Sequence, residues 1–526
     1  MTLSDPRRAL LPLALALACA TTAMPVLAQG LQTSFEPGEP APTQAAGALQ
    51  VTIGNGPAAP YAAKRNAGYS GLHALRYSSE GGSARRELFK ADLPIEADTT
   101  LSWLVLPEIV GKDTVASTYV SLDLLLDDGS RVSAGTARDQ HGVAIGALAQ
   151  GESKTLYPQQ WARKAVRLGD VPTLKGRRVV AIELEVASAE GAPVSGWIDD
   201  VRLDAQPRQQ PQRVSDWVLT TRGTQANGTF SRGNNFPATA VPHGFNFWTP
   251  VTDAGALNWL YRWNDQNDAQ NRPQLQALAL SHQPSPWMGD RQTFQVMPSA
   301  SRGVPEADRR KRALSFDRRH ESARPYRYDV RFDNGIAAAI APTDHAALFR
   351  FDFPEGGDAN LLFDNVDARG GLTLDAATQT LSGYTDTRSG LSNGASRMYV
   401  VASFDKPWRS SGRLDTGRPT GYIKFDAGSE RRVTMRIATS LISVDAAQPR
   451  TGNRRRRYAG ERGRPRTGRV GRAPGPLRHR RCQRRPEDHA VLQPVPAVPV
   501  PEFRPRERGQ RRRTGVALRQ PGQRQR

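Results

Sequence analysis

Apolar residues alternate with polar ones, or form short unbroken runs, along most of the chain, and turn-forming residues separate these runs. Period-two spacing is typical of strands that bury one face. No run of helix length has an amphipathic pattern. We therefore predict an antiparallel β-sandwich of the jelly-roll type over residues 29–205. Its strand-like runs are residues 100–107, 117–126, 164–168, 177–187 and 196–203.

The same pattern continues in a second part of the chain, after a Pro/Gln-rich stretch at residues 206–215 that reads as a linker. Gly356 and Gly357 mark a turn between two of the later runs. We predict a second, larger antiparallel sandwich over residues 216–450, so the expected fold class is mainly β, with two antiparallel β-sandwich domains. Its strand-like runs are residues 294–298, 326–332, 346–353, 360–364, 397–404, 421–426 and 431–444.

Residues 1–28 have the layout of a signal peptide. Arg7 and Arg8 precede an apolar run at residues 10–24, and small residues precede the expected cleavage point after Ala28. The run is too short to span a bilayer comfortably. We therefore expect a secreted or periplasmic protein with no membrane association after signal cleavage.

The formal net charge of +21 is concentrated near the carboxy terminus. Residues 451–526 contain 23 Arg, no Lys and 5 acidic residues, which gives this tail +18 and leaves +3 for the remaining chain. A basic balance favours a nucleic-acid partner, but only the tail has it, so we predict no nucleic-acid partner for the sandwiches. Cys19 and Cys482 lie outside the sandwiches, which therefore hold neither a disulfide framework nor a thiolate metal site.

The tail has the composition of a GC-rich gene read in the wrong frame, because it is rich in Arg, Pro and Gly and lacks Lys. Back-translation with permitted codons and a shift of one base yields an amphipathic, helix-like sequence of ordinary globular composition. We interpret residues 451–526 as an out-of-frame, disordered segment that follows a frameshift near residues 445–453. The alternative is a genuine basic arm that binds RNA or an anionic surface.

Residues 228–299 collect the side chains that suit a sugar ligand. A pyranose presents C–H faces that stack on aromatic rings, and hydroxyls that pair with amides and carboxylates. Taken singly, each tryptophan here is better explained as a core or hairpin aromatic. The cluster is less easily explained that way, because buried Trp and Asn side chains both need polar partners. The segment places Trp248, Trp259, Trp263 and Trp287 among Asn234, Asn235, Arg262, Asp265, His282, Gln283 and Asp290.

Short motifs follow one another here in a recognisable order: Gly-Asn before Phe-Pro, then Val-Pro-x-Gly, Ser-His, Gly-Asp and Met-Pro. They fall on Gly233, Asn234, Phe236, Pro237, Val241, Pro242, Gly244, Ser281, His282, Gly289, Asp290, Met297 and Pro298. This order resembles the amino-terminal domain of glycoside hydrolase family 92, the calcium-dependent exo-α-mannosidases. Residues 316–354 and 440–448 resemble later strands of that domain, so the resemblance spans residues 216–448. Where the family usually has a second His, this chain has Pro284, which changes the contacts expected in that subsite.

The resemblance implies a sandwich that packs against a helical domain and lends one wall to a mannose site. Inverting hydrolysis needs two carboxyls about 6.5–9.5 Å apart, and the family's acid, base and calcium ligands lie in the helical domain. We therefore expect no catalytic residue and no metal ligand in this chain. The resemblance implies the amino-terminal fragment of a secreted α-mannosidase, which binds mannose-containing glycans but does not hydrolyse them. The sugar-facing residues implied by position are Asn234, Trp259, Arg262, Asp265, His282, Gln283, Trp287 and Asp290.

Two functional alternatives stay open. The chain could be a non-catalytic carbohydrate-binding protein, or a nucleic-acid binder that acts through its tail. Asp265 with Asp268, or Asp290 alone, could mimic a catalytic carboxyl pair, although loop acids explain them equally. His320 and Glu321 are interpreted as structural or ion-paired strand residues.

The first sandwich has a resemblance of its own. Residues 70–79 and 196–203 resemble strands of the galactose-binding-like fold that many carbohydrate-binding modules share. Asp199 and Asp200, at the end of the last strand, are either oxygen ligands of a structural cation or solvated acids.

Overall fold

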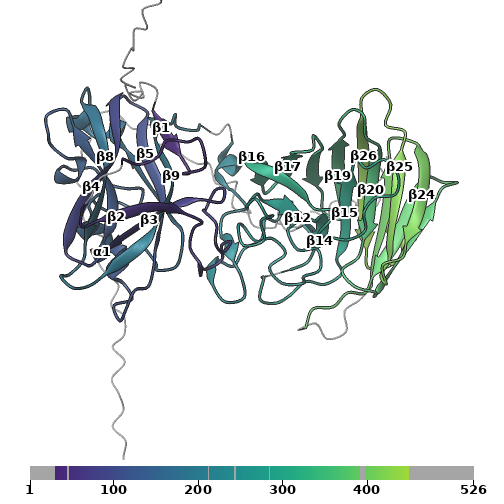
Figure 1. Cartoon of the computed structure of the whole chain (residues 1–526). Coiled ribbons are helices and arrows are strands. Elements are labelled where there is room, and N and C mark those ends of the chain that lie inside the picture. Colours follow the sequence, from purple (N-terminus) through teal and green to yellow (C-terminus); the bar gives the residue numbers. More distant parts are fainter. Residues whose placement is uncertain are drawn as a thin grey trace, which may run out of the picture. The chain divides into compact units, whose positions relative to one another are not determined.

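The computed structural model describes residues 30–43, 47–210, 213–241, 244–283, 285–390 and 397–448 (Figure 1). The predicted signal peptide with its cleavage point, both cysteines and the basic tail lie outside these residues. Antiparallel strands dominate the described part, as the residue pattern predicted. Its α-helices are the short α1 (Ala147–Glu152) and α2 (Val444–Ala447), and no helix in this part is long and apolar enough to cross a bilayer.

Strands β1 to β9 form two antiparallel sheets that enclose one apolar core. Leu75 and Tyr77 come from the larger sheet, and Leu122 and Leu184 from the smaller one; all four are buried. The larger sheet has the order β2 (Gln50–Gly54), β3 (Ala74–Ser79), β9 (Val194–Ala205), β5 (Thr99–Pro107) and β7 (Ala162–Arg167), with β1 (Leu31–Thr33) also on β9. The smaller has the order β4 (Ser83–Pro94), β8 (Arg178–Ala187) and β6 (Val120–Leu126).

Strand β5 differs from its prediction as a half-buried strand, because every one of its residues is buried. It is a central strand between β9 and β7. One face contributes Leu101 and Trp103 to the main core. The other face is covered as well, since Leu104 packs in a second apolar cluster with Trp161 and Trp197. These two tryptophans come from distant segments, so the local pattern of β5 gave no sign of them.

Asp199 is not a solvated acid, and that interpretation was wrong. Its side chain is fully buried, and Oδ2 accepts hydrogen bonds from the backbone nitrogens of Tyr69 (2.6 Å) and Ser70 (3.1 Å). Asp200 accepts from the hydroxyls of Ser34 (3.1 Å) and Ser70 (2.8 Å). Burial, and then the neighbouring charge of Asp200, raise the pKa of Asp199 well above its ordinary value. The two carboxyls therefore tie the middle of β9 to the preceding loops.

Strands β12 to β26 form a second pair of antiparallel sheets, with the hairpin of β10 (Thr224–Ala226) and β11 (Ser231–Gly233) before them. The six-stranded sheet has the order β12 (Phe247–Val251), β14 (Ala277–Ser281), β15 (Phe294–Ser299), β20 (Ala359–Asp364), β25 (Thr420–Phe425) and β24 (Trp408–Leu414). The nine-stranded sheet has the order β13 (Gln274–Leu275), β16 (Leu314–Arg324), β17 (Arg327–Phe332), β18 (Ala337–Pro342), β19 (Ala346–Asp352), β26 (Arg432–Ser440), β23 (Met398–Phe404), β22 (Thr380–Thr385) and β21 (Gly370–Asp375).

Strand β19 shows why these residues form a sandwich. Phe349 and Phe351 are fully buried, whereas Leu348 is exposed and Arg350 points away from the core. Alternate side chains of a strand lie on opposite faces, so one face joins the core. Phe349 packs edge-on against Trp248 of β12, with 5.3 Å between ring centroids. That contact joins the two sheets.

A buried carboxylate in β16 fastens a long loop to the nine-stranded sheet. Glu321 accepts hydrogen bonds from the hydroxyls of Tyr261 (2.8 Å) and Tyr328 (3.0 Å), and pairs with Arg318 (2.9 Å). The Arg318 guanidinium lies 3.9 Å from the centre of the Trp263 ring. The pairing of β16 with β17 is irregular between Phe316 and Glu321, and such bulges re-aim side chains. The interpretation of Glu321 as a structural, ion-paired residue is confirmed.

Replacing Glu321 with Gln should lower the free energy of unfolding by about 3 kcal/mol, because Arg318 then loses its partner in a largely buried site. Chemical denaturation measures this change. The matched control is Asp317→Asn on the same strand. Asp317 pairs with Arg319, whose side chain is 85% exposed, so this change should cost less than about 1 kcal/mol. Equal effects of the two substitutions would contradict the role of Glu321.

Candidate functional site

Two tryptophans of the predicted site form one aromatic pair. The rings of Trp259 and Trp287 meet edge to face, with 4.6 Å between centroids. Trp259 is 8% exposed and Trp287 is 54% exposed, so the buried ring supports the exposed one. Trp259 has a φ of 45°, which a bulky residue seldom adopts unless its surroundings hold it there. We call Trp259 and Trp287 the tryptophan pair.

The backbone beside the tryptophan pair is held by one carbonyl oxygen. The oxygen of Leu257 accepts hydrogen bonds from Nε2 of Gln283 (2.7 Å) and from the backbone nitrogen of Asp290 (2.7 Å). Asn258 donates to the carbonyl oxygen of Pro286 (2.8 Å). These bonds bring residues 257–259 and 283–290 together, so Gln283 and Asp290 hold in place the two segments that carry the tryptophan pair.

Asp290 is buried, and His282 is partly buried. Asp290 is fully buried, and its Oδ1 accepts from the backbone nitrogens of His282 (2.8 Å) and Arg291 (2.7 Å). Burial raises the pKa of Asp290 to about 7. Burial lowers the pKa of His282 to about 4, and its Nε2 lies 3.1 Å from Oδ1 of Asn246. Asp290 clamps its own loop and is not placed to act on a ligand.

Arg262 and Asp265 form a second group of the predicted residues. They lie 3.7 Å apart, and Asn227 donates a hydrogen bond to Oδ2 of Asp265 (3.1 Å). Burial raises the pKa of Asp265 above its ordinary value, against the opposing effects of Asn227 and Arg262. The loop of Asn227 also reaches the tryptophan pair, since a Cβ placed on Gly228 would lie 3.8 Å from the Trp259 ring. This loop links the two groups.

The remaining predicted residues have different positions. Asn234 has a φ of 62° and directly follows β11. Gly233 of β11 pairs with Thr224. The carbonyl oxygen of Thr224 accepts a hydrogen bond from the backbone nitrogen of Trp263 (3.2 Å). Asn234 therefore sits at the edge of the same region. Trp248, by contrast, is a core residue, so for that ring the core interpretation is correct.

Among the residues that the structure describes, no group of three or more His, Cys, Asp or Glu side chains is arranged to hold a metal ion. The described side chains therefore do not fit the carboxylate-rich site that calcium prefers. We derive no step through calcium.

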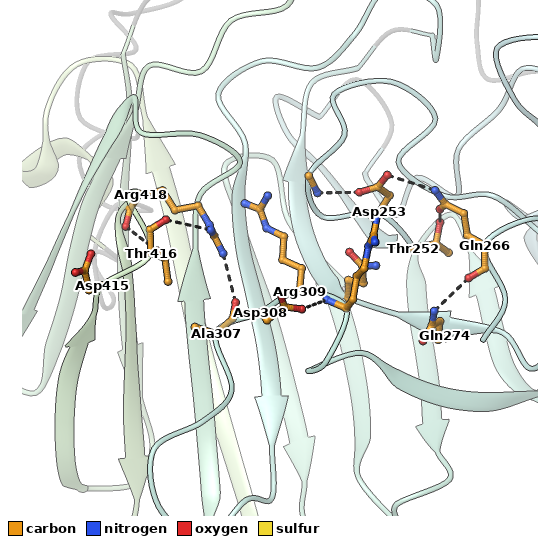
Figure 2. Close-up of a pocket in the computed structure, with 13 residues that line it drawn as sticks. Thr252, Asp253, Gln266, Gln274, Ala307, Asp308, Arg309, Asp415, Thr416 and Arg418 are labelled. Atoms are coloured by element: carbon orange, nitrogen blue, oxygen red, sulfur yellow. Dashed lines mark hydrogen bonds between the residues drawn. The ribbon is translucent and has the colours of Figure 1, made fainter. Parts of the chain in front are cut away.

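A cavity of about 820 Å³ adjoins the loop that bears Arg262 and Asp265. Figure 2 shows Gln266, Gln274, Arg309 and Arg418 around it. Gln266 connects it to that loop, because the hydroxyl of Thr252 donates to Oε1 of Gln266 (2.5 Å) and accepts from the backbone nitrogen of Arg262 (3.0 Å). Sequence reasoning missed this cavity, because three segments far apart in the chain form it.

Comparison with protein families matches residues 217–440 to the glycosyl hydrolase family 92 N-terminal domain. Comparison with curated proteins gives no match. The match covers most of the second sandwich and every predicted sugar-facing residue.

Several solved structures are similar to this chain. An inverting mannosidase of family GH92 from Bacteroides thetaiotaomicron is 29% identical, with a TM-score of 0.41, and the similarity covers 46% of this chain and 33% of that one. A family GH92 α-mannosidase from the same organism is 21% identical, with a TM-score of 0.37, and the similarity covers 44% of this chain and 34% of that one. That α-mannosidase is also known in complex with mannoimidazole. This chain spans about a third of the length of these proteins.

The buried carboxyl of Asp290 predicts a pH dependence of stability. Its folded pKa of about 7 lies above the ordinary value of 3.8, so the folded chain gains stability from the protonated form at low pH and loses it as the pH rises. Relative to Asp290→Asn, the wild-type free energy of unfolding should fall between about pH 4 and pH 7 and then level off. Urea denaturation of both proteins across this range measures the difference, from which the titration of His282 cancels. A flat difference would contradict the assignment.

Proposed function

We propose that this chain is the glycan-binding, amino-terminal part of a secreted α-mannosidase, because residues 217–440 match the N-terminal domain of glycosyl hydrolase family 92. The family match carries the proposal. Mannose-containing glycans are the proposed partner, and the tryptophan pair with Arg262, Asp265 and Asn234 is the proposed contact surface.

The geometry of the tryptophan pair supports sugar binding. An exposed indole backed by a buried one offers a flat apolar face, and stacking on such a face suits the C–H side of a pyranose. Arg262 and Asp265 supply a donor and an acceptor for hydroxyls, and their side chains are 27% and 13% exposed. Arg262 and Asp265 lie on the same loop as Trp259, and Trp287 lies on the loop between β14 and β15.

The proposal assigns binding, rather than turnover, to the described residues. Asp290 is enclosed and occupied by backbone donors, and Asp265 is paired with Arg262 and Asn227. Neither carboxyl is placed as the free acid or base that inverting hydrolysis requires. We place the acid, the base and the calcium ligands outside the described residues. Secretion rests on the signal-peptide pattern of residues 1–28.

Replacing Trp287 with Ala should weaken binding of an α-mannobioside about tenfold, because the stacking face is lost, and Trp287→Phe should recover most of the affinity. Isothermal titration calorimetry on the full chain measures both. Since Trp287 is half exposed, the fold should tolerate the change. The control is Trp217→Ala, which removes another exposed indole (67%) outside the site. Equal losses for Trp217→Ala and Trp287→Ala would refute the proposed contact surface.

Incubation of the full chain with the α-mannobioside and calcium should release no mannose. Binding without release agrees with the proposal. EDTA-sensitive release of mannose would show that the chain has its own catalytic groups, and the assignment of binding alone would then be wrong.

A further inference from the structure

A buried cluster of charged side chains contributes to the wall of the cavity in Figure 2. Asp364, at the end of β20, has no exposed side-chain surface and pairs with three arginines: Arg309 (3.2 Å), Arg312 (3.0 Å) and Arg418 (2.7 Å). One carboxylate compensates only one guanidinium. Two positive charges therefore remain without a buried partner in this cluster.

The three guanidiniums are held firmly in place. The side chains of Arg309, Arg312 and Arg418 are only 16%, 4% and 18% exposed. Arg309 also donates to the carbonyl oxygens of Asn365 (2.6 Å) and Val366 (3.0 Å). Arg309 and Arg418 line the cavity, so their surplus charge lies at its wall. Nη1 of Arg312, also buried, has no hydrogen bond to the described residues.

Acidic residues at the cavity rim do not cancel this buried charge. Asp308 and Asp415 are exposed, and Asp253 is held by the backbone nitrogen of Gly255 (3.0 Å) and by Gln266 (3.3 Å). When Arg310 is included, the charges of the four arginines in this region are equal in number to those of Asp253, Asp308, Asp364 and Asp415. Solvent screens the exposed acids much more than the buried guanidiniums. The interior of the cavity is therefore positive, and its rim is mixed.

The uncharged lining identifies the rest of the ligand. Gln266, Gln274, Gln276, Thr252 and Thr416 provide hydrogen-bonding groups, and no aromatic residue lines the cavity. Its volume of about 820 Å³ lies within the range of small-molecule sites. The lining residues therefore cannot stack on a sugar ring, but they can form hydrogen bonds with hydroxyl groups of a ligand.

We propose that this cavity binds a small polyhydroxylated anion, namely a sugar acid or a sugar phosphate. The oxyanion lies against Arg309 and Arg418, within reach of Arg310, and the hydroxyls pair with Gln266 and Gln274. Planar guanidiniums match carboxylate and phosphate oxygens in geometry as well as charge. The inference goes beyond the proposed function, because it concerns a separate site and a charged ligand.

The test uses the full chain carrying Trp287→Ala, so that the tryptophan pair does not contribute. Calorimetry in about 0.15 M salt compares mannose 6-phosphate and glucuronate with neutral mannose. We expect at least one anion to bind about tenfold more tightly than mannose. Either anion supports the site, and the tighter one identifies the preferred oxyanion. Equal affinities for all three sugars, or no binding of either anion, would overturn the proposal.

Two substitutions of opposite charge effect test charge recognition by the cavity. Arg310→Gln removes an exposed arginine with no ion pair to the described residues, and it should weaken anion binding about tenfold. Asp415→Asn removes a rim acid and should strengthen it about threefold. Arg319→Gln, which changes an exposed arginine outside the cavity, is the matched control and should have no effect. The proposal fails if Arg310→Gln and Asp415→Asn shift the affinity in the same direction, or if Arg319→Gln matches Arg310→Gln.

Discussion

The carboxylate of Glu321 is the constraint on which the candidate site depends. It is buried, it accepts from two tyrosine hydroxyls, and it neutralises Arg318. Tyr261 lies between Trp259 and Arg262 in the chain, and Arg318 stacks on Trp263. A single strand residue therefore fixes the loop that carries Trp259 and the Arg262–Asp265 group. Without that anchor, a loop with so many polar residues would have few interactions that hold it in one conformation.

The site illustrates how a sandwich carries function at its loops. The core of the second sandwich is made of alternating strand residues such as Phe349 and Phe351, which say nothing about ligands. The polar and aromatic residues of the candidate site lie on the connections between β12, β14 and β15, and on the loop after β10. Loops positioned by a rigid scaffold are the usual location of binding residues. Residues 217–440, which match the glycosyl hydrolase family 92 N-terminal domain, include these connections.

Sequence reasoning succeeded where the signal was local. The strands, the mainly β class and the aromatic character of residues 228–299 all follow from spacing and composition. It failed where the outcome depends on distant partners. Asp199 was read as a possible solvated acid, because nothing nearby in sequence announces the backbone donors of Tyr69 and Ser70. The arginine cavity was missed for the same reason: only the pairing of β15, β20 and β25 brings its segments to Asp364.

The edge-to-face contact between Trp259 and Trp287 has a consequence for affinity. A freely rotating surface indole loses conformational entropy when a ligand fixes it, and that loss weakens binding. Here the buried ring already restricts the exposed one, so the cost of ordering falls on folding rather than on association. A preorganised surface of this kind therefore loses less conformational entropy on binding than a mobile side chain would.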